Sequence, residues 1–345
     1  MASSEGSDLM KAILLDKTGP IEQNPLRYSD YDCPELSRDE VLIKIRSCGV
    51  CRSNLNVIEG VYSRLGIPSK SPIIPGHEII GVVEEAGVDV GNLAVGDRVG
   101  IQPLYSACGR CEFCLSGREH LCPTRLITGE TVDGGYAEYI KGKADFVYLV
   151  PRDLKDDEAA PLFCPGVTAY RAVKQAGLFP SKTVAIFGIG GVGHVAVQFA
   201  KMTGATVVAI SRNRRNLDLA LRLGADRILT QDDNLVSEMK NIGYADSAIV
   251  FAPSQEAIDR AQRITKPGGT IVLGVSGDIK NLMFFFEKTI KGTAIGTRLD
   301  MREVLQIASA GKIKISTQTF PLSQAQDALR KLKQGEIEGR AVLLP

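Results

Sequence analysis

The sequence predicts an α/β protein of two domains, one rich in short β-strands and one built on a doubly wound parallel sheet. Three observations support this prediction. Short strand-like runs fill the first 150 residues, strands and helices alternate after about residue 180, and a glycine-rich loop follows the first alternating strand. A chain of 345 residues also suits two hydrophobic cores better than one.

The β-rich character of the N-terminal part comes from short valine- and isoleucine-containing runs separated by turn-forming residues. Such spacing is typical of strands in a barrel or sandwich and not of βα units. The last residues, Ala341–Pro345, are strand-like as well and predict a return of the chain to this domain. Clear examples of the short runs are Val41–Ile45, Gly81–Gly87 and Asp97–Ile101.

The second part begins with a largely helical stretch at Asp156–Ala176, which two prolines interrupt. Beyond it, apolar runs alternate with segments of helical periodicity, which predicts parallel strands with helices on both faces. We therefore assign residues 156–295 to this domain, and residues 1–155 and 296–345 to the β-rich domain. The predicted strands are Thr183–Phe187, Thr206–Ile210, Arg227–Leu229, Ala248–Phe251 and Thr270–Val275, and the predicted helices are Val192–Met202 and Asn216–Leu223.

The composition argues against several classes of partner. Lysine plus arginine number 41 and aspartate plus glutamate 40, so the net charge of +1 gives no reason to expect nucleic acid or an anionic membrane. No apolar run approaches the roughly 20 residues of a membrane span. The first nine residues, MASSEGSDL, do not resemble a signal peptide. We expect a cytoplasmic protein with a disordered extension before Met10.

Four cysteines in one 15-residue window form the strongest single motif, C-x2-C-x2-C-x7-C. Short gaps between cysteines let the thiolates converge on one metal ion, and four thiolates close a tetrahedral zinc shell. We therefore predict a structural zinc site. An iron–sulfur cluster, which also uses four thiolates, is the alternative. The four residues are Cys108, Cys111, Cys114 and Cys122.

A glycine loop of the form G-x-G-x-x-G lies between the predicted strand Thr183–Phe187 and a predicted helix. In a dinucleotide-binding (Rossmann) domain the first glycine makes the turn, the second lets the pyrophosphate approach, and the third allows close helix packing. The helix N-terminus then favours the phosphates. The alternative is a tight turn that binds nothing. The predicted cofactor-binding residues here are Gly188, Gly190, Gly191, Val192 and Gly193.

The end of the next predicted strand indicates which nicotinamide cofactor binds. An NAD-binding domain would place an acidic residue near Ser211 for the ribose 2′-hydroxyl, and this sequence has none there. Ser211 can donate to a 2′-phosphate, and Arg212 offers a planar cationic group. We therefore predict that NADP(H) is preferred over NAD(H). The alternative is that these arginines only begin a solvated helix.

Three scattered segments, taken together with the cysteine cluster, indicate a second metal site. They are GVC ending at Cys51, GHE around His77, and CPGVTAY beginning at Cys164. Alone, each cysteine or histidine would more often be a core residue. With these segments, residues 10–345 resemble the zinc-dependent alcohol dehydrogenases of the medium-chain dehydrogenase/reductase superfamily. The resemblance implies a GroES-like catalytic domain, a Rossmann domain and two zinc ions per chain.

The resemblance also implies the roles of individual residues. Cys51, His77 and Cys164 would hold the catalytic zinc, Ser53 would take the substrate proton, and Glu78 would lie beside the metal or approach it transiently. Two thiolates and one neutral imidazole neutralise Zn²⁺ and leave its fourth position open for substrate. The further cofactor contacts implied are Arg52, Thr168, Arg298 and Arg340. Arg298 and Arg340 could equally be surface ion-pair partners.

Two residues depart from the family pattern. Asn54 stands where the family often has an aspartate that orients the zinc-bound histidine, and it brings no charge to that hydrogen bond. Asn56 stands where many relatives have the histidine that ends a proton relay, and asparagine cannot shuttle a proton at neutral pH. We therefore expect the proton to pass from Ser53 to a ribose hydroxyl or to water.

These observations together predict a reversible alcohol dehydrogenase that interconverts a primary or secondary alcohol with an aldehyde or ketone, with its active site in the cleft between the domains. We expect small-molecule substrates, no nucleic acid or membrane partner, and a homodimer or homotetramer. One alternative is a C=C (enone or enoyl) reductase of the same superfamily, against which the complete ligand set argues. Another is a non-catalytic, zinc-stabilised nucleotide-binding protein.

Overall fold

The computed structural model describes residues 9–280 and 282–345, which divide into two compact units. Unit 1 comprises the described residues up to Cys164, together with Thr297–Ser309 and Ile315–Pro345. Unit 2 comprises Pro165–Gly296 and Ala310–Lys314. The change of unit falls after Cys164 and not after residue 155, because the turns at 156–163 pack on strands of unit 1. The extension expected before Met10 covers residues 1–9, of which 1–8 lie outside the described part and Leu9 already belongs to a strand.

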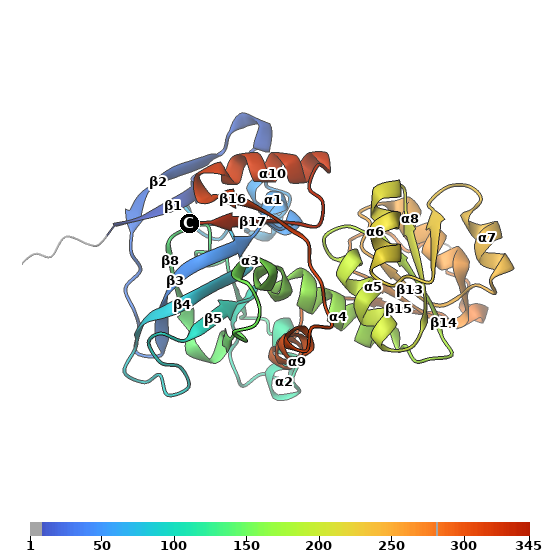
Figure 1. The fold of residues 1–345 in the computed structure, drawn as a ribbon, viewed down its shortest axis with the longest axis horizontal. Helices are drawn as coiled ribbons and strands as arrows, with labels where there is room; N and C mark the ends of the chain where they lie inside the picture. The colour runs from blue at the N-terminus through green and yellow to red at the C-terminus, as the bar shows by residue number, and fades with distance from the viewer. Residues whose placement is uncertain (1–8, 281) are drawn as a thin grey trace, which may run out of the picture. The chain divides into compact units, whose positions relative to one another are not determined.

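Unit 1 is built on a mainly antiparallel sheet that joins strands from residues 40–149 to the two C-terminal strands. Its strands follow the order β16-β17-β3-β4-β5-β9, and β8 pairs with β3. The C-terminal strand β17 pairs with β3, which agrees with the predicted return of the chain to this unit. In Figure 1, β3, β4 and β5 lie side by side. The strands are β3 (Glu40–Gly49), β4 (Ile79–Ala86), β5 (Arg98–Ile101), β8 (Tyr139–Lys143), β9 (Val147–Leu149), β16 (Thr317–Pro321) and β17 (Arg340–Leu344).

Smaller elements complete unit 1. A hairpin of β1 and β2 contributes buried residues such as Ile13 and Leu15 to the same core as β3 and β4. The helix α10 lays Ala325, Ala328 and Leu329 on that core. The bounds are β1 (Leu9–Leu15), β2 (Leu26–Asp32), β6 (Leu104–Ser106), β7 (Leu126–Ile127), α1 (Arg52–Ile58), α2 (Glu112–Leu115), α3 (Asp156–Ala159), α9 (Arg298–Ser309) and α10 (Ala325–Gln334).

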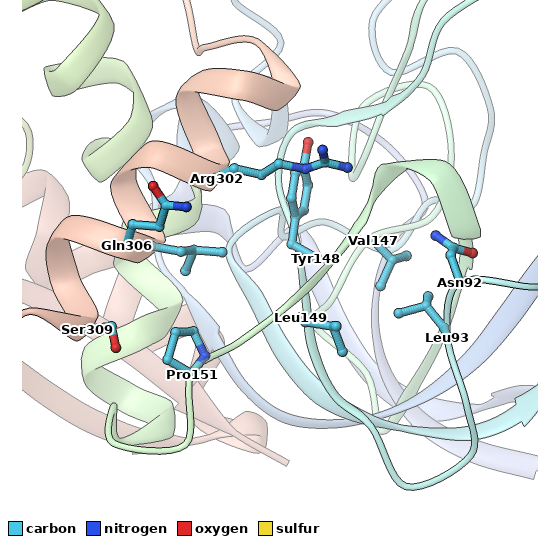
Figure 2. Close-up of a pocket in the computed structure, with 10 residues that line it drawn as sticks. Asn92, Leu93, Val147, Tyr148, Leu149, Pro151, Arg302, Gln306 and Ser309 are labelled. Carbon is cyan, nitrogen blue, oxygen red and sulfur yellow. The ribbon is translucent and has the colours of Figure 1, made fainter.

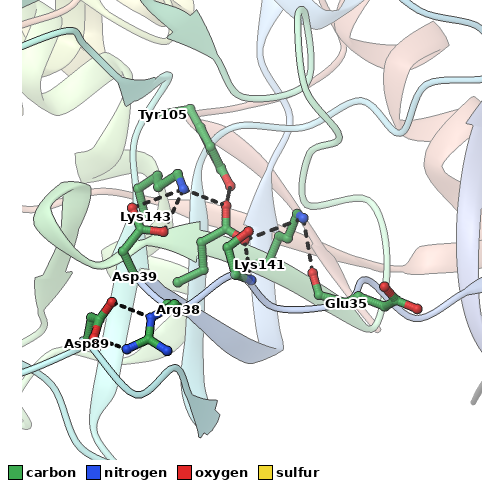
Figure 3. Close-up of polar contacts among 9 residues, drawn as sticks. Glu35, Arg38, Asp39, Asp89, Tyr105, Lys141 and Lys143 are labelled. Atoms are coloured by element: carbon green, nitrogen blue, oxygen red, sulfur yellow. Dashed lines mark hydrogen bonds and ion pairs between the residues drawn. The ribbon is translucent and has the colours of Figure 1, made fainter.

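A buried carboxylate at the start of β3 joins three strands (Figure 3). Glu40 accepts a hydrogen bond from the Tyr105 hydroxyl of β6 at 3.1 Å. It also lies 3.2 Å from the Lys143 ammonium and 3.4 Å from that of Lys141, both on β8. The Ser37 backbone N–H donates to the same carboxylate at 3.0 Å. A charge buried in this way is stabilised by several partners at once.

Unit 2 is a six-stranded parallel sheet in the order β12-β11-β10-β13-β14-β15. The order reverses between β10 and β13, which makes the sheet doubly wound. Helix α5 packs against α4 and α6, whereas α7 packs against α8, so two groups of helices cover the two faces. This arrangement and the β-rich unit 1 confirm the predicted fold class. The strands are β10 (Thr183–Phe187), β11 (Thr206–Ser211), β12 (Arg227–Thr230), β13 (Ala245–Val250), β14 (Thr265–Leu273) and β15 (Thr289–Gly292), and the helices are α4 (Pro165–Ala176), α5 (Gly193–Met202), α6 (Arg214–Arg222), α7 (Leu235–Asn241) and α8 (Gln255–Ile264).

Helices in the described part of the chain are either too short or too polar to cross a bilayer.

Candidate active site

The structure gathers four of the predicted site residues in unit 1. Cys51 directly precedes α1, His77 and Glu78 directly precede β4, and Cys164 directly precedes α4. One ligand atom from each lies within 4.8 Å of the others, and all four residues are buried. Each side chain is therefore fixed by the start of a regular element, so the cluster is held rigidly.

Two glycines make the room that this cluster needs. Gly76 has φ of +100°, and a Cβ there would lie 2.4 Å from the Tyr136 ring, so only glycine fits before His77. At Gly49 of β3, a Cβ would lie 2.0 Å from Oε2 of Glu78. The GVC and GHE segments thus owe their glycines to packing around the carboxylate and the imidazole.

The geometry of the cluster fits a zinc ion. The Sγ atoms of Cys51 and Cys164 are 3.8 Å apart. Two sulfurs bound tetrahedrally to zinc at about 2.3 Å would be separated by about 3.8 Å. Oε2 of Glu78 is buried and has no hydrogen-bond partner among the described residues, so one further oxygen is available at the site. The set of two thiolates, one imidazole and a nearby carboxylate suits zinc chemically.

His77 presents its two ring nitrogens to different surroundings. Nε2 lies 3.3 Å from Ser53 Oγ, on the side of the cysteines, and Nδ1 lies 3.2 Å from Asn54 Nδ2. A neutral imidazole that binds metal through Nε2 carries its proton on Nδ1 and donates it. In the structure the Tyr136 hydroxyl donates to Asn54 Oδ1 at 3.3 Å. With zinc on Nε2, a flip of the Asn54 amide would let Oδ1 accept the Nδ1 proton of His77 and Nδ2 donate to the Tyr136 hydroxyl.

Arg340 and Glu78 form a buried ion pair beside the cluster. Arg340 is 4% exposed, and its Nη2 donates to Glu78 Oε1 and, at 2.9 Å, to the Val50 carbonyl. Burial raises the pKa of Glu78, and the Arg340 guanidinium opposes that rise. The resemblance implied a contact of Arg340 with the cofactor pyrophosphate. Arg340 therefore forms an ion pair, as the alternative interpretation proposed, but the pair is buried and does not lie on the surface.

The other residues at the start of α1 differ in their surroundings. Ser53 Oγ lies 3.1 Å from Cys51 Sγ, so its hydroxyl reaches the ligand cluster. Arg52, the first residue of α1, is exposed. Asn56 Nδ2 donates to the Tyr62 hydroxyl at 3.1 Å, which directs that amide toward Tyr62.

The four-cysteine motif also converges in unit 1. Ligand sulfurs of Cys108, Cys111, Cys114 and Cys122 all lie within 4.8 Å of one another around the short helix α2. The Sγ atoms of Cys111 and Cys114 are 3.5 Å apart, and those of Cys108 and Cys114 are 3.9 Å apart. The Cys108 N–H donates to Cys122 Sγ at 3.5 Å, the kind of contact that offsets thiolate charge. A closed shell of four thiolates fits a structural zinc.

Arg298 belongs to the surroundings of the four-cysteine loop. It begins α9, its backbone N–H donates to Glu119 Oε1 at 2.7 Å, and its guanidinium lies 5.0 Å from the centre of the Phe146 ring. Glu119 follows the cysteines Cys108 to Cys114 and is itself buried. These contacts match the ion-pair alternative for Arg298, and its cofactor role stays a prediction.

The glycine loop of unit 2 has the shape that a pyrophosphate requires. Gly188 has φ of +86°, and a Cβ there would lie 2.5 Å from the Ala252 nitrogen. A Cβ on Gly193 would lie 2.1 Å from the Gly188 carbonyl oxygen, whereas one on Gly190 would meet open space. The first and last glycines therefore serve packing, and Gly190 faces the opening. Val192 caps α5, and Thr168 lies half-buried in α4 of the same unit.

A pocket of about 660 Å³ adjoins this loop at the carboxyl ends of the parallel strands. Ser211, at the end of β11, and Arg212 line it together with Gly188 and Gly190. Its lining contains no acidic residue. The structure thus brings the predicted phosphate loop and the predicted 2′-phosphate residues into one pocket of unit 2, at the place where doubly wound sheets bind ligands.

A second hollow, of about 580 Å³, lies within unit 1 between β9 and α9. Figure 2 shows Arg302 of α9 extending toward Tyr148 of β9, and Gln306 of α9 and Leu149 of β9 also line the hollow. None of the predicted site residues lines it. We assign it no role in the chemistry.

Comparison with known families and proteins agrees with this geometry. Residues 37–152 match the alcohol dehydrogenase GroES-like domain, and residues 191–310 match the zinc-binding dehydrogenase family. An alcohol dehydrogenase of Geobacillus stearothermophilus is 42% identical over 95% of this chain and 99% of its own length. An NAD-dependent alcohol dehydrogenase of Sulfurisphaera tokodaii is 35% identical over 97% of this chain and all of its own.

The fold is likewise similar to solved structures. The alcohol dehydrogenase of the archaeon Aeropyrum pernix superimposes with a TM-score of 0.89 at 32% identity, covering 97% of this chain and all of that one. Both family domains, the full-length relatives and the two ligand clusters therefore point the same way. The chain belongs to the zinc-dependent alcohol dehydrogenases of the medium-chain dehydrogenase/reductase superfamily, whose members interconvert alcohols and carbonyl compounds with a nicotinamide cofactor.

Proposed function

We propose that this protein transfers a hydride reversibly between a primary or secondary alcohol and NADP⁺, and that each chain holds two zinc ions. The buried cluster of Cys51, His77 and Cys164, with the Ser53 hydroxyl beside it, is the observation that carries the proposal. Cys108, Cys111, Cys114 and Cys122 would hold the second, structural zinc.

In this mechanism the residues at the cluster position the substrate and move its proton. Bound zinc supplies Lewis acidity, which favours loss of the alcohol proton and polarises a carbonyl in the reverse direction. Ser53 Oγ would accept the alcohol proton and pass its own proton to a ribose hydroxyl or water. The nicotinamide cofactor, held at the glycine loop beside Gly188 and Gly190, would supply the acceptor for the hydride of the carbinol carbon. Asn54 holds the His77 ring through Nδ1. Asn56 is paired with Tyr62 and carries no proton onward.

The preference for NADP(H) has to rest on this chain's own residues, because the Sulfurisphaera relative is NAD-dependent. In support of the proposal, the pocket at the end of β11 offers Ser211 and Arg212 and no carboxylate. A carboxylate is what an NAD-binding domain uses to hold the ribose 2′-hydroxyl, and it would repel a 2′-phosphate.

We also propose a cytoplasmic homo-oligomer, either a dimer or a tetramer. The eight cysteines, all within the described part of the chain, form no disulfide, which suits a reducing compartment. Leu282–Phe286 of unit 2 expose consecutive apolar side chains just before the edge strand β15, and such a patch favours contact with another copy.

Metal analysis of the purified protein, combined with kinetics, tests the proposed chemistry. Wild type should contain two zinc ions per chain and reduce an aldehyde or ketone with NADPH. Cys164→Ala should retain one zinc and lose about a thousandfold or more in kcat/KM, since several kcal/mol of charge stabilisation disappear. Cys33→Ala, at a cysteine outside both clusters, should retain both zincs and full activity. Cys164→Ala with two zincs and unchanged activity would overturn the proposal.

A further inference from the structure

We propose that Gln231 is a specificity-determining residue, whose side-chain amide donates a hydrogen bond to the 2′-phosphate of the cofactor. The inference rests on the proposed NADP(H) preference and assigns a residue that neither the sequence motifs nor the family resemblance indicated. Gln231 directly follows β12 and lines the pocket of unit 2 beside the glycine loop.

The starting observation is a buried hydrogen-bond donor without an acceptor. The Gln231 side chain is 7% exposed, and its Nε2 has no hydrogen-bond partner among the described residues. A buried amide donor left unpaired costs about 1–3 kcal/mol. Native proteins rarely keep such a group unless a ligand or ordered water satisfies it. Because Gln231 lines the pocket, a turn of its side-chain amide would bring this donor to an acceptor on a bound ligand.

The backbone places Gln231 next to the two residues already predicted to read the 2′-phosphate. Its N–H donates to the Ser211 carbonyl at 3.1 Å, because β12 lies beside β11 in the sheet. Ser211 and Gln231 therefore lie next to each other at one edge of the pocket, at the ends of the neighbouring parallel strands β11 and β12. Arg212 lines the same pocket and extends from the same strand end.

Each of these three residues has at least one hydrogen-bond donor left for a ligand. Ser211 Oγ already accepts from the Asn213 N–H at 3.2 Å, which leaves its own hydroxyl proton free to donate. Arg212 makes no side-chain hydrogen bond or ion pair with any other described residue, whereas the neighbouring Arg214 is held by Asp218 at 3.0 Å. A hydroxyl, a guanidinium and an amide N–H thus converge, with no acidic residue in the lining.

Such a set of donors matches a ligand group with several acceptor oxygens and negative charge. A ribose 2′-hydroxyl offers one oxygen and needs an acceptor for its proton, whereas a phosphate monoester offers three oxygens and no obligatory donor. Among the parts of a dinucleotide, the 2′-phosphate therefore fits best. Gln231 adds a neutral donor to the cationic Arg212, so its loss should affect phosphorylated ligands selectively.

Binding measurements on the intact protein test this assignment without depending on turnover. The ligands are NADPH, NADH, adenosine 2′-phosphate and adenosine 5′-phosphate, with dissociation constants from calorimetry or fluorescence at one fixed salt concentration. Gln231→Met keeps the length of the side chain and removes the donor. It should weaken NADPH and adenosine 2′-phosphate by about tenfold and leave NADH and adenosine 5′-phosphate within about twofold. Gln231→Glu adds a repelling charge and should weaken the same two ligands by about a hundredfold.

Asn234→Asp is the matched control, because it makes the same amide-to-carboxylate change three residues further along. Asn234 is exposed and does not line the pocket, so all four dissociation constants should stay within about twofold of wild type. Circular dichroism of each variant shows whether it is folded, and the two Gln231 variants test the inference independently of each other.

The outcomes separate this inference from the proposed function. If wild type binds NADH as tightly as NADPH, the cofactor preference itself is wrong. If wild type prefers NADPH but both Gln231 variants keep that ratio, only the role of Gln231 is overturned. Equal weakening of adenosine 2′-phosphate and adenosine 5′-phosphate would place Gln231 against the adenosine and would also overturn its assignment to the phosphate.

Discussion

Arg212 is the single side chain on which cofactor choice should depend most. It is exposed, lines the pocket, and has no ion-pair partner among the described residues that would have to be given up on binding. Arg212→Asp should weaken NADPH by about a hundredfold and leave NADH unchanged or tighter, because the new carboxylate repels a 2′-phosphate and can accept from a 2′-hydroxyl. The ratio of the two dissociation constants is the measurement.

A neighbouring arginine provides the control for that experiment. Arg215 is the second residue of α6, is exposed, and does not line the pocket. Arg215→Asp makes the same change of two charge units and should alter the NADPH-to-NADH ratio by no more than about twofold. Equal effects of the two substitutions would mean that only general electrostatic attraction, and not a contact of Arg212, favours the phosphate.

At the same scale, sequence reasoning reached residues with a motif and missed residues that act through a distant partner. The spacing of the four cysteines predicted their gathering, whereas the gathering of the GVC and GHE segments was implied by the family resemblance. Arg340 and Glu78 were both predicted as site residues, but they lie 262 positions apart, and no spacing rule predicts their ion pair with each other. Gln231 was missed for a similar reason, because its significance depends on a neighbouring strand and on an unpaired atom. Neither the neighbouring strand nor the unpaired atom can be recognised from the amino-acid sequence alone.

The elements that could be predicted are those with a strong signal of their own. Thr183–Phe187 was predicted with the bounds that β10 has, since five apolar and β-branched residues end at a glycine loop. Helices α7 and α8 were missed. α7 has seven residues and buries only Leu235 and Met239, so its periodicity is too weak to detect. α8 is as long as α5, but two of the four residues that it buries are alanines, which give a weak apolar signal. The start of β14 was placed too late, because Pro267, Gly268 and Gly269 suggest a turn where the structure has a strand.

Glu40 links β3 to β8 and should make the stability of unit 1 depend on pH. Burial alone would raise the pKa of Glu40, but the Ser37 N–H, Lys143 and Lys141 outweigh it and lower the pKa to about 2. A carboxylate with a lowered folded-state pKa stabilises the protein above its unfolded pKa, here 4.5. That stability is lost as the pH falls from 4.5 towards 2.

Glu40→Gln should therefore destabilise unit 1 by about 1–2 kcal/mol at pH 7, less than the full linkage value because the lysine ammonium groups are partly solvated. The difference from wild type should shrink as the pH is lowered from 5 towards 3. Denaturation midpoints of both proteins at each pH measure it, and acid effects on the metal sites, being common to both, cancel in the difference.

Glu35→Gln serves as the control on the same segment. The Lys141 ammonium donates to the backbone carbonyl of Glu35 and not to its side chain, and the Glu35 carboxylate is exposed (Figure 3). This substitution should change stability by less than about 0.5 kcal/mol at every pH. A Glu40→Gln difference that stays constant from pH 7 to pH 3 would show that the buried charge of Glu40 does not stabilise the fold.

For the whole molecule, the exposed apolar segment of unit 2 is the feature that bears on assembly. Leu282, Met283, Phe284, Phe285 and Phe286 are 50%, 48%, 88%, 60% and 38% exposed. Single exposed hydrophobic residues are common on soluble proteins, but five in succession are not. They precede β15, the last strand in the described sheet order, so backbone hydrogen-bonding groups and apolar side chains lie near one another at one edge of unit 2. A two-fold axis at this edge would bury the same surface on both copies.

Phe284→Asp is therefore expected to shift the protein towards the monomer. Phe284 is the most exposed of the five, so the substitution should leave the fold of the isolated unit intact while placing a charge in the proposed contact. Sedimentation or light scattering at micromolar concentrations measures the mass. Val88→Asp makes the same kind of change at a comparably exposed residue of unit 1, 76% accessible, and should leave the oligomer unchanged. If Phe284→Asp assembles as wild type does, the contact between copies lies elsewhere on the chain.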